Sequence, residues 1–310
     1  MRATVAKATV AKATVVKSDA VAMTGSSARA RDFVALAKPR LNLLVVASTL
    51  VGYAMANGDP LGFWRVCGLL FGTGLVAGGA SAFNQVLERD LDALMKRTRG
   101  RPMPDQRLQP LEGILFGSAI TLTGLLLILA TSNLLAATVA LATLLSYVVV
   151  YTPLKRKSSF GTVIGAIPGA LPPIIGWAAV EGGLPVQPWT LFGIMFLWQL
   201  PHFLAIAWMY REDYARAGFP MLPVLEPDGR STGRQAVVYA AALVPLSLAP
   251  TLMRMAGELY FAGALLLGLA FLWQTIQFAR SRSVGDARRV FFGSIIYLPL
   301  LWILMIANKV

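Results

Sequence analysis

Three side chains that can bind cations recur at intervals of four residues, where an apolar segment gives way to a basic loop. They are Asn84, Glu88 and Asp92, within ASAFNQVLERDLDALMKRTRGRPMP. An α-helix turns by about 100° per residue, so steps of four place the amide and both carboxylates on one helical face. A carboxylate is costly in lipid and usually functional there, and three oxygen-bearing side chains suit a hard cation such as Mg²⁺. The spacing therefore predicts a magnesium site on this face.

The composition places that site in a membrane protein. Of 310 residues, 56% are hydrophobic and 14% are charged, with a mean hydropathy of +0.63. These values lie outside the range of soluble domains. No segment alternates apolar and polar residues as a barrel strand does, so we expect an all-α, polytopic membrane helical bundle. Windows of about 20 apolar residues predict about nine transmembrane helices, at residues 41–57, 66–87, 113–132, 134–152, 160–180, 189–209, 235–254, 257–279 and 290–308.

Basic residues are distributed unequally between the predicted loops. If the N-terminus is cytoplasmic, the 28 lysines and arginines all lie on the cytoplasmic side except Arg65, Arg254 and Lys309. The positive-inside rule then predicts a cytoplasmic N-terminus and an external C-terminus. This topology, with an anionic substrate, explains the net charge of +13, so we expect no nucleic-acid partner.

The first 37 residues differ from the rest of the chain. ATVAK, ATVAK and ATVVK follow one another from Ala3 to Lys17. A five-residue period builds neither a helix face nor a strand face. We therefore expect a mobile basic cytoplasmic tail at residues 1–37 and a single transmembrane domain at residues 38–310. The expected location is the bacterial inner (plasma) membrane; because the acid-poor tail also resembles a transit peptide, the mitochondrial inner membrane is the alternative.

Cationic side chains follow the acidic face and also end the fourth predicted span. Carboxylates that hold a metal, beside bases that bind oxygens, are typical of a diphosphate site, where guanidinium groups stabilise charge on the leaving group. The alternative is a positive-inside loop with solvated ion pairs, which we favour for Arg99 and Arg107 and leave open for Lys155. The candidate substrate contacts are Arg97, Arg101, Tyr151, Lys155 and Arg156.

A second acidic segment repeats this arrangement. WMYREDYARAGFPMLP follows the sixth span and carries Glu212 and Asp213 beside Arg211 and Arg216. Four predicted crossings separate Asp92 from Asp213, so both acids emerge on the same side, at equivalent places in two pseudo-repeated four-helix halves. We expect the two acidic helix ends to face each other and to hold a metal-bound diphosphate between them.

Four segments resemble the UbiA-type intramembrane prenyltransferases and cover nearly the whole chain after the tail. They are AKPRLN, NQVLERDLDALMKRTRGRP, YTPLKRKSSFGTVIGAIPGALPPIIGWAA and LWQLPHFLAIAWMYREDYARAGFPMLPV. The second contains the family's NxxxDxxxD-type motif, and its RTxxRP extension resembles the haem branch rather than the quinone branch. The resemblance implies that the metal ligands and catalytic residues are Asn84, Glu88, Asp92 and Asp213, and that Lys38 and Arg40 join the substrate contacts.

Two departures from the family's pattern concern the metal site. Glu88 stands where Asp is commoner, which keeps the charge but lengthens the reach. Met209 stands four residues before Asp213, so the second segment offers fewer acidic ligands. These departures weaken the case for a fully symmetric two-metal site.

The resemblance also implies a reaction. It is the transfer of a farnesyl group from farnesyl diphosphate to a vinyl group of haem B, with a hydroxyl taken from water, giving haem O and diphosphate; Mg²⁺ is the cofactor. Ionising an allylic diphosphate requires a neutralised leaving group and a chamber without water, which an intramembrane site can provide. Tyr147, Tyr151 and Trp208 are candidates for stabilising the cation. The implied partners are the lipid bilayer and a haem A synthase or terminal oxidase assembly.

Two interpretations stay open for His202, the only histidine, which follows Pro201 in the sixth span. The imidazole either forms a hydrogen bond inside the bundle or contacts haem, as axial ligand or partner of a propionate. The fifth span carries Gly161, Gly165 and Gly169, with Pro172 shortly after them, and we expect close packing and a broken helix there.

Other classes of protein share some of these features. A quinone or chlorophyll polyprenyltransferase would use the same diphosphate chemistry, although the RTxxRP and LPHF segments weigh against it. A secondary transporter would also contain broken helices and buried acids, but its acids would lie near the bilayer midplane rather than at helix ends.

Overall fold

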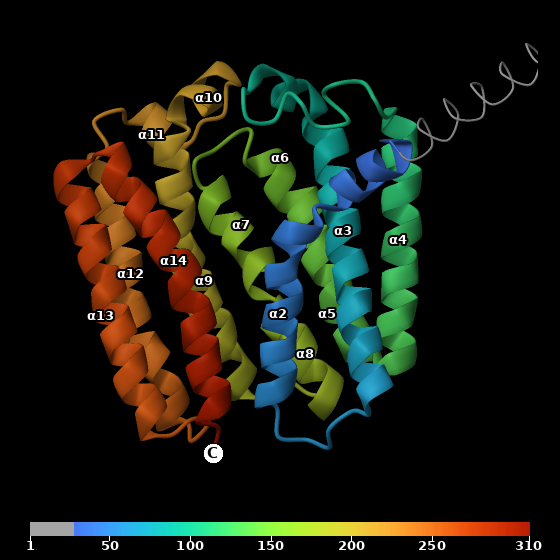
Figure 1. Ribbon diagram of the computed structural model, residues 1–310, viewed down its shortest axis with the longest axis vertical. Helices are drawn as coiled ribbons and strands as arrows, with labels where there is room; N and C mark the ends of the chain where they lie inside the picture. Colours follow the sequence, from blue (N-terminus) through green and yellow to red (C-terminus); the bar gives the residue numbers. More distant parts are fainter. Residues whose placement is uncertain (1–27) are drawn as a thin grey trace, which may run out of the picture.

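The computed structural model describes residues 28–310, and this part of the chain is almost entirely α-helical. Its long helices run side by side as one bundle (Figure 1). The described residues form no β-strand. Ala256 and Lys309 form an isolated antiparallel β-bridge. After a first helix at Ala28–Ala37, the elements are α2 (Pro39–Met55), α3 (Phe63–Leu94), α4 (Pro110–Thr131), α5 (Leu134–Leu145), the π-helix η1 (Ser146–Tyr151), α6 (Thr152–Leu154), α7 (Gly161–Ala170), α8 (Pro172–Glu181), α9 (Val186–Met209), α10 (Arg211–Arg216), α11 (Leu222–Leu225), α12 (Arg230–Leu252), α13 (Glu258–Ser281) and α14 (Val284–Ala307).

The helices confirm the predicted membrane class. In residues 28–310, eight are long and apolar enough to cross a bilayer, or nine if the bent pair Ala28–Ala37 and Pro39–Met55 is one span. Helices satisfy their own backbone hydrogen bonds, which is the condition for spanning lipid. The chain is therefore a multi-pass α-helical membrane protein.

Two groups of four helices flank the span made by α7 and α8. The first group contains α2, α3, α4 and α5, and the second contains α9, α12, α13 and α14. α8 packs against α2 and α5 in the first group, while α7 packs against α9 in the second. Prolines break this central span as predicted, because α7 ends at Ala170 and α8 begins at Pro172. By contrast, α9 continues without a break through Pro201.

The described chain begins with a packed helix. The helix Ala28–Ala37 meets α2 at an angle of 42°. Its Leu36 is fully buried in a cluster with Ala82, Met103 and Leu108. A helix with an apolar anchor therefore lies within the last ten residues of the predicted tail, and the boundary at residue 37 stays a prediction. The repeats from Ala3 to Lys17 lie outside the described residues.

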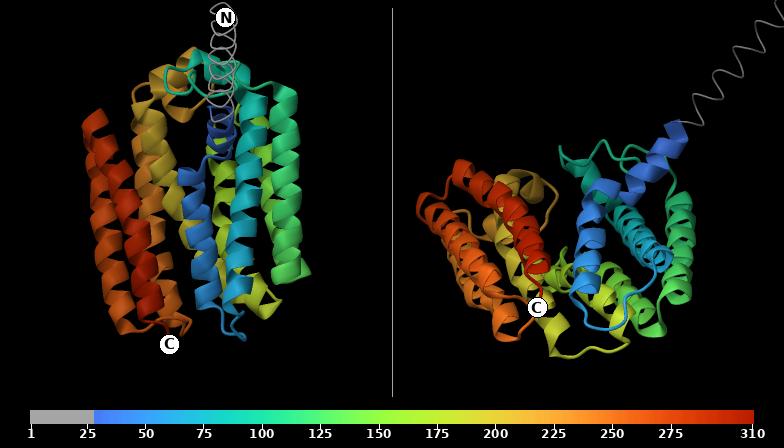
Figure 2. Two further views of the ribbon diagram at one scale, coloured as in Figure 1. Left: turned by 45° about the vertical axis from the view of Figure 1, so that its right-hand side comes forward. Right: turned by 60° about the horizontal axis from the view of Figure 1, so that its bottom comes forward.

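Both acidic segments lie at one end of the bundle. The loop after α3 and the short helices α6, α10 and α11 gather at the top of Figure 1, whereas the C-terminus lies at the bottom. The left view of Figure 2 shows the same separation. Four crossings between the segments thus bring them to one side, as the sequence predicted.

Candidate functional site

α3 presents Asn84, Glu88 and Asp92 on one buried face. Their exposed fractions are 4%, 2% and 1%. α3 continues to Leu94, beyond the predicted span end at residue 87, so all three residues stay in regular helix and keep the spacing of one face. Buried carboxylates need partners, and the structure supplies a basic side chain for each.

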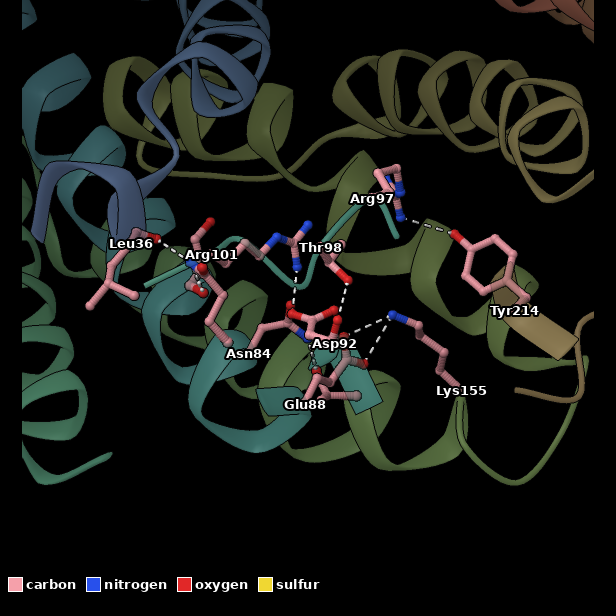
Figure 3. Close-up of polar contacts among 12 residues, drawn as sticks. Leu36, Asn84, Glu88, Asp92, Arg97, Thr98, Arg101, Lys155 and Tyr214 are labelled. Carbon is pink, nitrogen blue, oxygen red and sulfur yellow. Dashed lines mark hydrogen bonds and ion pairs between the residues drawn. The ribbon is translucent and has the colours of Figure 1, made fainter. Parts of the chain in front are cut away.

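Asp92 is held by the loop that follows α3 (Figure 3). Arg101 turns back so that its Nη1 lies 2.6 Å from Asp92 Oδ2. The Thr98 hydroxyl donates to the Asp92 backbone carbonyl at 2.8 Å and so satisfies a carbonyl at the helix end. The RTxxRP segment therefore brings Thr98 and Arg101 to the last acid of the motif.

Glu88 is paired with Lys155, which follows α6 from a distant part of the chain (Figure 3). Lys155 Nζ lies 2.9 Å from Oε1 and donates a hydrogen bond to Oε2 at 3.0 Å. Burial is the largest single effect and lowers the pKa of Lys155, but the charge and hydrogen bond of Glu88, together with Tyr214 and Tyr147, raise this pKa above its ordinary value. Lys155 is therefore a cation at neutral pH. Oε1 lies within ion-pair distance of this ammonium but accepts no well-aligned hydrogen bond.

The π-helix η1 positions the aromatic side of the site. Asn84 Nδ2 donates to the Thr152 hydroxyl at 3.3 Å. Tyr147 and Tyr151 lie one π-turn apart, with ring centroids at 5.2 Å. A Cβ at Gly165 of α7 would clash with the Tyr151 ring, so this glycine allows the close approach of α7. Irregular π-turns are frequent at functional sites.

The second acidic segment reaches the first, but through residues other than its acids. Arg97 Nη2 donates to the Tyr214 hydroxyl at 3.4 Å, and its guanidinium lies 5.1 Å from the Tyr210 ring centroid. Asp213 instead pairs with Arg216 of its own helix at 2.8 Å. The two loops meet as predicted, while the assignment of Asp213 as a metal ligand stays a prediction.

The oxygen donors of α3 suit a hard divalent cation. Two carboxylates and one amide share the face, and one Glu88 oxygen lacks an aligned donor. Mg²⁺ is usually bound by one or two carboxylates together with substrate phosphates and water. Among the described residues, three or more Asp, Glu, His or Cys side chains nowhere gather into a complete protein-only cage. The chemistry of the site therefore fits an ion shared with a substrate.

A cavity of about 270 Å³ adjoins this face along α3: its lining ends at Ser81, about one helical turn before Asn84, and does not include the three oxygen-bearing residues themselves. Most of its lining side chains are apolar, contributed by α2, α3, α5, α7, α8 and α9. Lys38, Tyr147, Tyr151, Gln199 and Phe203 also line it. The charged face thus adjoins an apolar space that can hold a hydrocarbon chain.

His202 lies outside the lining of that cavity, between α9 and α14. Its ring stacks on Trp198 and Phe291, with centroids at 5.5 and 5.0 Å. Nδ1 lies 2.7 Å from the Ser294 hydroxyl, which itself donates to the Phe291 carbonyl at 2.6 Å. Since that hydroxyl has one proton, Nδ1 must carry the hydrogen, and Nε2 keeps its lone pair. The structure supports the bundle hydrogen bond, and the haem contact stays a prediction.

Three other predicted residues lie apart from the buried face. Trp208 does not line the cavity and instead packs on Phe278 and Arg211, so its proposed role beside the cation is not supported. Arg40 and Arg156 are exposed. Their role as substrate contacts stays a prediction.

Sequence reasoning missed several residues that build the site. Thr152, Gln199 and Tyr214 contact predicted site residues or line the cavity. Tyr214 adjoins Asp213 in YREDY, and Thr152 adjoins Tyr151 in YTPLKRK. Their positions next to predicted residues were the available signal, but side-chain direction depends on the π-turn and on loop packing.

Comparison with known proteins agrees with this architecture. Residues 45–298 match the UbiA prenyltransferase family. The protoheme IX farnesyltransferase of Solibacter usitatus (strain Ellin6076) is 47% identical over 90% of this chain and 99% of its own. That of Koribacter versatilis (strain Ellin345) is 41% identical over 94% of this chain and 97% of its own.

Solved structures share the fold at low sequence identity. A structure described as digeranylgeranylglyceryl phosphate synthase has a TM-score of 0.75 at 17% identity, covering 90% of this chain and 98% of that one. A UbiA homologue from Archaeoglobus fulgidus bound to GPP and Mg²⁺ has a TM-score of 0.64 at 17% identity, covering 89% of this chain and 99% of that one. With the family match spanning most of its length, the chain belongs to the UbiA prenyltransferase family.

Proposed function

We propose that the protein transfers the farnesyl group of farnesyl diphosphate to a vinyl group of haem B, giving haem O and diphosphate. The observation that best supports this proposal is that two buried carboxylates, Glu88 and Asp92, each form an ion pair with a basic side chain close to an apolar cavity. The relatives named protoheme IX farnesyltransferase, alike over nearly their whole length, support haem as the acceptor.

Asn84, Glu88 and Asp92 would hold Mg²⁺, with Asp213 as a further ligand from the facing loop. The ion would supply neutralisation of the diphosphate charge. Lys155 and Arg101, now paired with the carboxylates, would then bind diphosphate oxygens. A guanidinium suits this task because its donors bind two oxygens at once. These six residues would thus stabilise the leaving group.

The apolar cavity would protect the allylic cation. Its walls exclude water from the farnesyl chain while the charged face holds the diphosphate. Tyr147 and Tyr151 line this space and offer ring faces to a cation. The vinyl group would attack the farnesyl carbon as the bond to diphosphate breaks, and the bonding pair would leave with diphosphate. The carbocation left on the former vinyl group, beside the porphyrin, would then be captured by one water molecule, which adds the hydroxyl and releases a proton.

Acceptor choice separates this proposal from a quinone prenyltransferase. Membranes containing the protein would receive farnesyl diphosphate and Mg²⁺ with either haem B or 4-hydroxybenzoate. We expect a farnesylated product from haem B and none from the aromatic acid. Farnesylation of 4-hydroxybenzoate alone would assign the chain to quinone synthesis instead.

The proposed orientation has the N-terminus in the cytoplasm and the C-terminus outside, in a bacterial inner membrane. We expect reporter fusions after Gly100, Lys157 and Gly229 to be cytoplasmic, because they follow the basic loops at one end of the bundle. Fusions after Gly58 and Val310 should be external. Gly100 and Gly229 on opposite sides would contradict a shared site.

Substitutions of His202 and Arg101 should weaken the binding of different substrates. We expect His202→Ala to weaken haem binding, seen as a changed Soret absorption, and to leave the affinity for farnesyl diphosphate unchanged. The reason is that Nδ1 is paired with Ser294, so the Nε2 lone pair is the part of the imidazole that could contact haem. Arg101→Ala should do the reverse, because its guanidinium serves the diphosphate side. An unchanged haem spectrum in His202→Ala would leave the imidazole its hydrogen bond to Ser294 alone.

A further inference from the structure

Lys38 occupies a sharp break between two helices. It separates the helix Ala28–Ala37 from α2 and has a φ of 46°, a left-handed conformation that non-glycine residues rarely adopt. Two side-chain amides stabilise the break. Asn42 Nδ2 donates to the Ala37 carbonyl at 2.6 Å, and Gln85 Nε2 donates to the Leu36 carbonyl at 2.8 Å. Strain that is held in this way frequently marks a functional position.

The break brings the Lys38 side chain to the wall of the apolar cavity. Among the residues that line the cavity, Lys38 is the one with a charged side chain. Lys155 and Arg101 each have a carboxylate partner. Among the described residues, no carboxylate lies within ion-pair distance of Lys38. Burial, together with the positive charge of Arg101, lowers the pKa of Lys38 to about 7, so the ammonium form needs an added anion to stabilise it.

An ammonium group in an apolar cavity requires an anion once water has been displaced. The farnesyl chain is a hydrocarbon and offers none. The diphosphate already has Lys155 and Arg101 on the acidic face. The remaining anion is a carboxylate on the acceptor, and haem B carries two propionates.

We propose that Lys38 binds a carboxylate of the acceptor substrate and thereby selects acidic acceptors and fixes their orientation in the cavity. The proposal rests on the proposed function. It assigns Lys38 to the acceptor, whereas Lys155 and Arg101 serve the prenyl diphosphate. A lysine suits a single carboxylate because its ammonium acts as a compact point charge.

The test compares haem B with its dimethyl ester, in which both propionates are neutral. At saturating farnesyl diphosphate, we expect the wild-type protein to prefer the free acid about tenfold or more in kcat/KM, the size of one charged hydrogen bond. In Lys38→Met the preference should vanish, because the acid loses its partner and the ester loses nothing. Lys38→Arg should keep most of the preference for the free acid. In both variants, the KM for farnesyl diphosphate should stay within about twofold of the wild-type value.

Lys157→Met is the matched control, since Lys157 is exposed and outside the cavity lining; its acid preference should equal that of the wild type. If Lys38→Met does not accumulate in the membrane, Lys38→Gln carries the same test. An unchanged acid preference in a variant with a raised KM for farnesyl diphosphate would assign Lys38 to the diphosphate and overturn the proposal.

Failure of the proposed function would look different, because no variant would then prenylate either form of haem. In that case, binding of haem B and of its ester to the purified protein, followed by absorption, measures the same preference without turnover. Equal affinities of the wild-type protein for acid and ester would also overturn the role of Lys38.

Discussion

Asp92→Ala is expected to lower farnesyl transfer by at least about 100-fold at saturating farnesyl diphosphate, the scale of losing one buried group that stabilises developing charge. Asp92 is 1% exposed and holds Arg101 at 2.6 Å. Its loss removes a predicted metal ligand and releases the guanidinium that would bind the leaving group. The measurement is the initial rate in membranes, normalised to the amount of inserted protein.

Asp90→Ala provides the control on the same helix. The Asp90 side chain is 84% exposed and pairs with neighbouring Arg89, so its loss should leave the rate close to the wild type. Glu88→Asp should retain measurable activity because the charge is kept. Near-normal turnover of Asp92→Ala would remove the α3 face from the mechanism.

Lys155→Met is expected to destabilise the protein as well as inactivate it. The side chains of Lys155 and Glu88 are 14% and 3% exposed, so the substitution leaves a carboxylate buried without its cation. Breaking a buried pair on one side costs about 3 kcal/mol. We expect a lower thermal unfolding temperature in detergent, together with a rate loss of about 100-fold from the missing diphosphate contact.

The double variant Glu88→Gln/Lys155→Met separates the two effects. With both charges removed, stability should return close to the wild type, because no unpaired ion remains in the interior. Activity should stay lost. If the double variant were as active as the wild type, the pair would be structural and the diphosphate site would lie elsewhere.

The acidic face could be predicted because its geometry is local. Asn84, Glu88 and Asp92 lie on one helix, and the 3.6-residue period alone places them together. The meeting of the two loops followed from the number of crossings. Neither inference required knowledge of how side chains pack.

The partners of those acids could not be predicted because they depend on tertiary geometry. Lys155 reaches Glu88 through the π-turn of η1, which the sequence does not mark. Tyr214, rather than Asp213, contacts the first loop because loop packing sets side-chain direction. The helix at Ala28–Ala37 was missed because its sequence belongs to the segment rich in Ser, Ala and Arg that follows the repeats and carries no long apolar stretch.

The central claim is that the acidic face and the apolar cavity farnesylate haem. The most direct measurement is the mass of the porphyrin product after the purified protein is incubated with haem B, farnesyl diphosphate and Mg²⁺. The account predicts haem O, with a mass increased by one farnesyl group and one hydroxyl, and no product with EDTA or with Asp92→Ala. Unmodified haem B under conditions where the protein is folded and binds both substrates would contradict it.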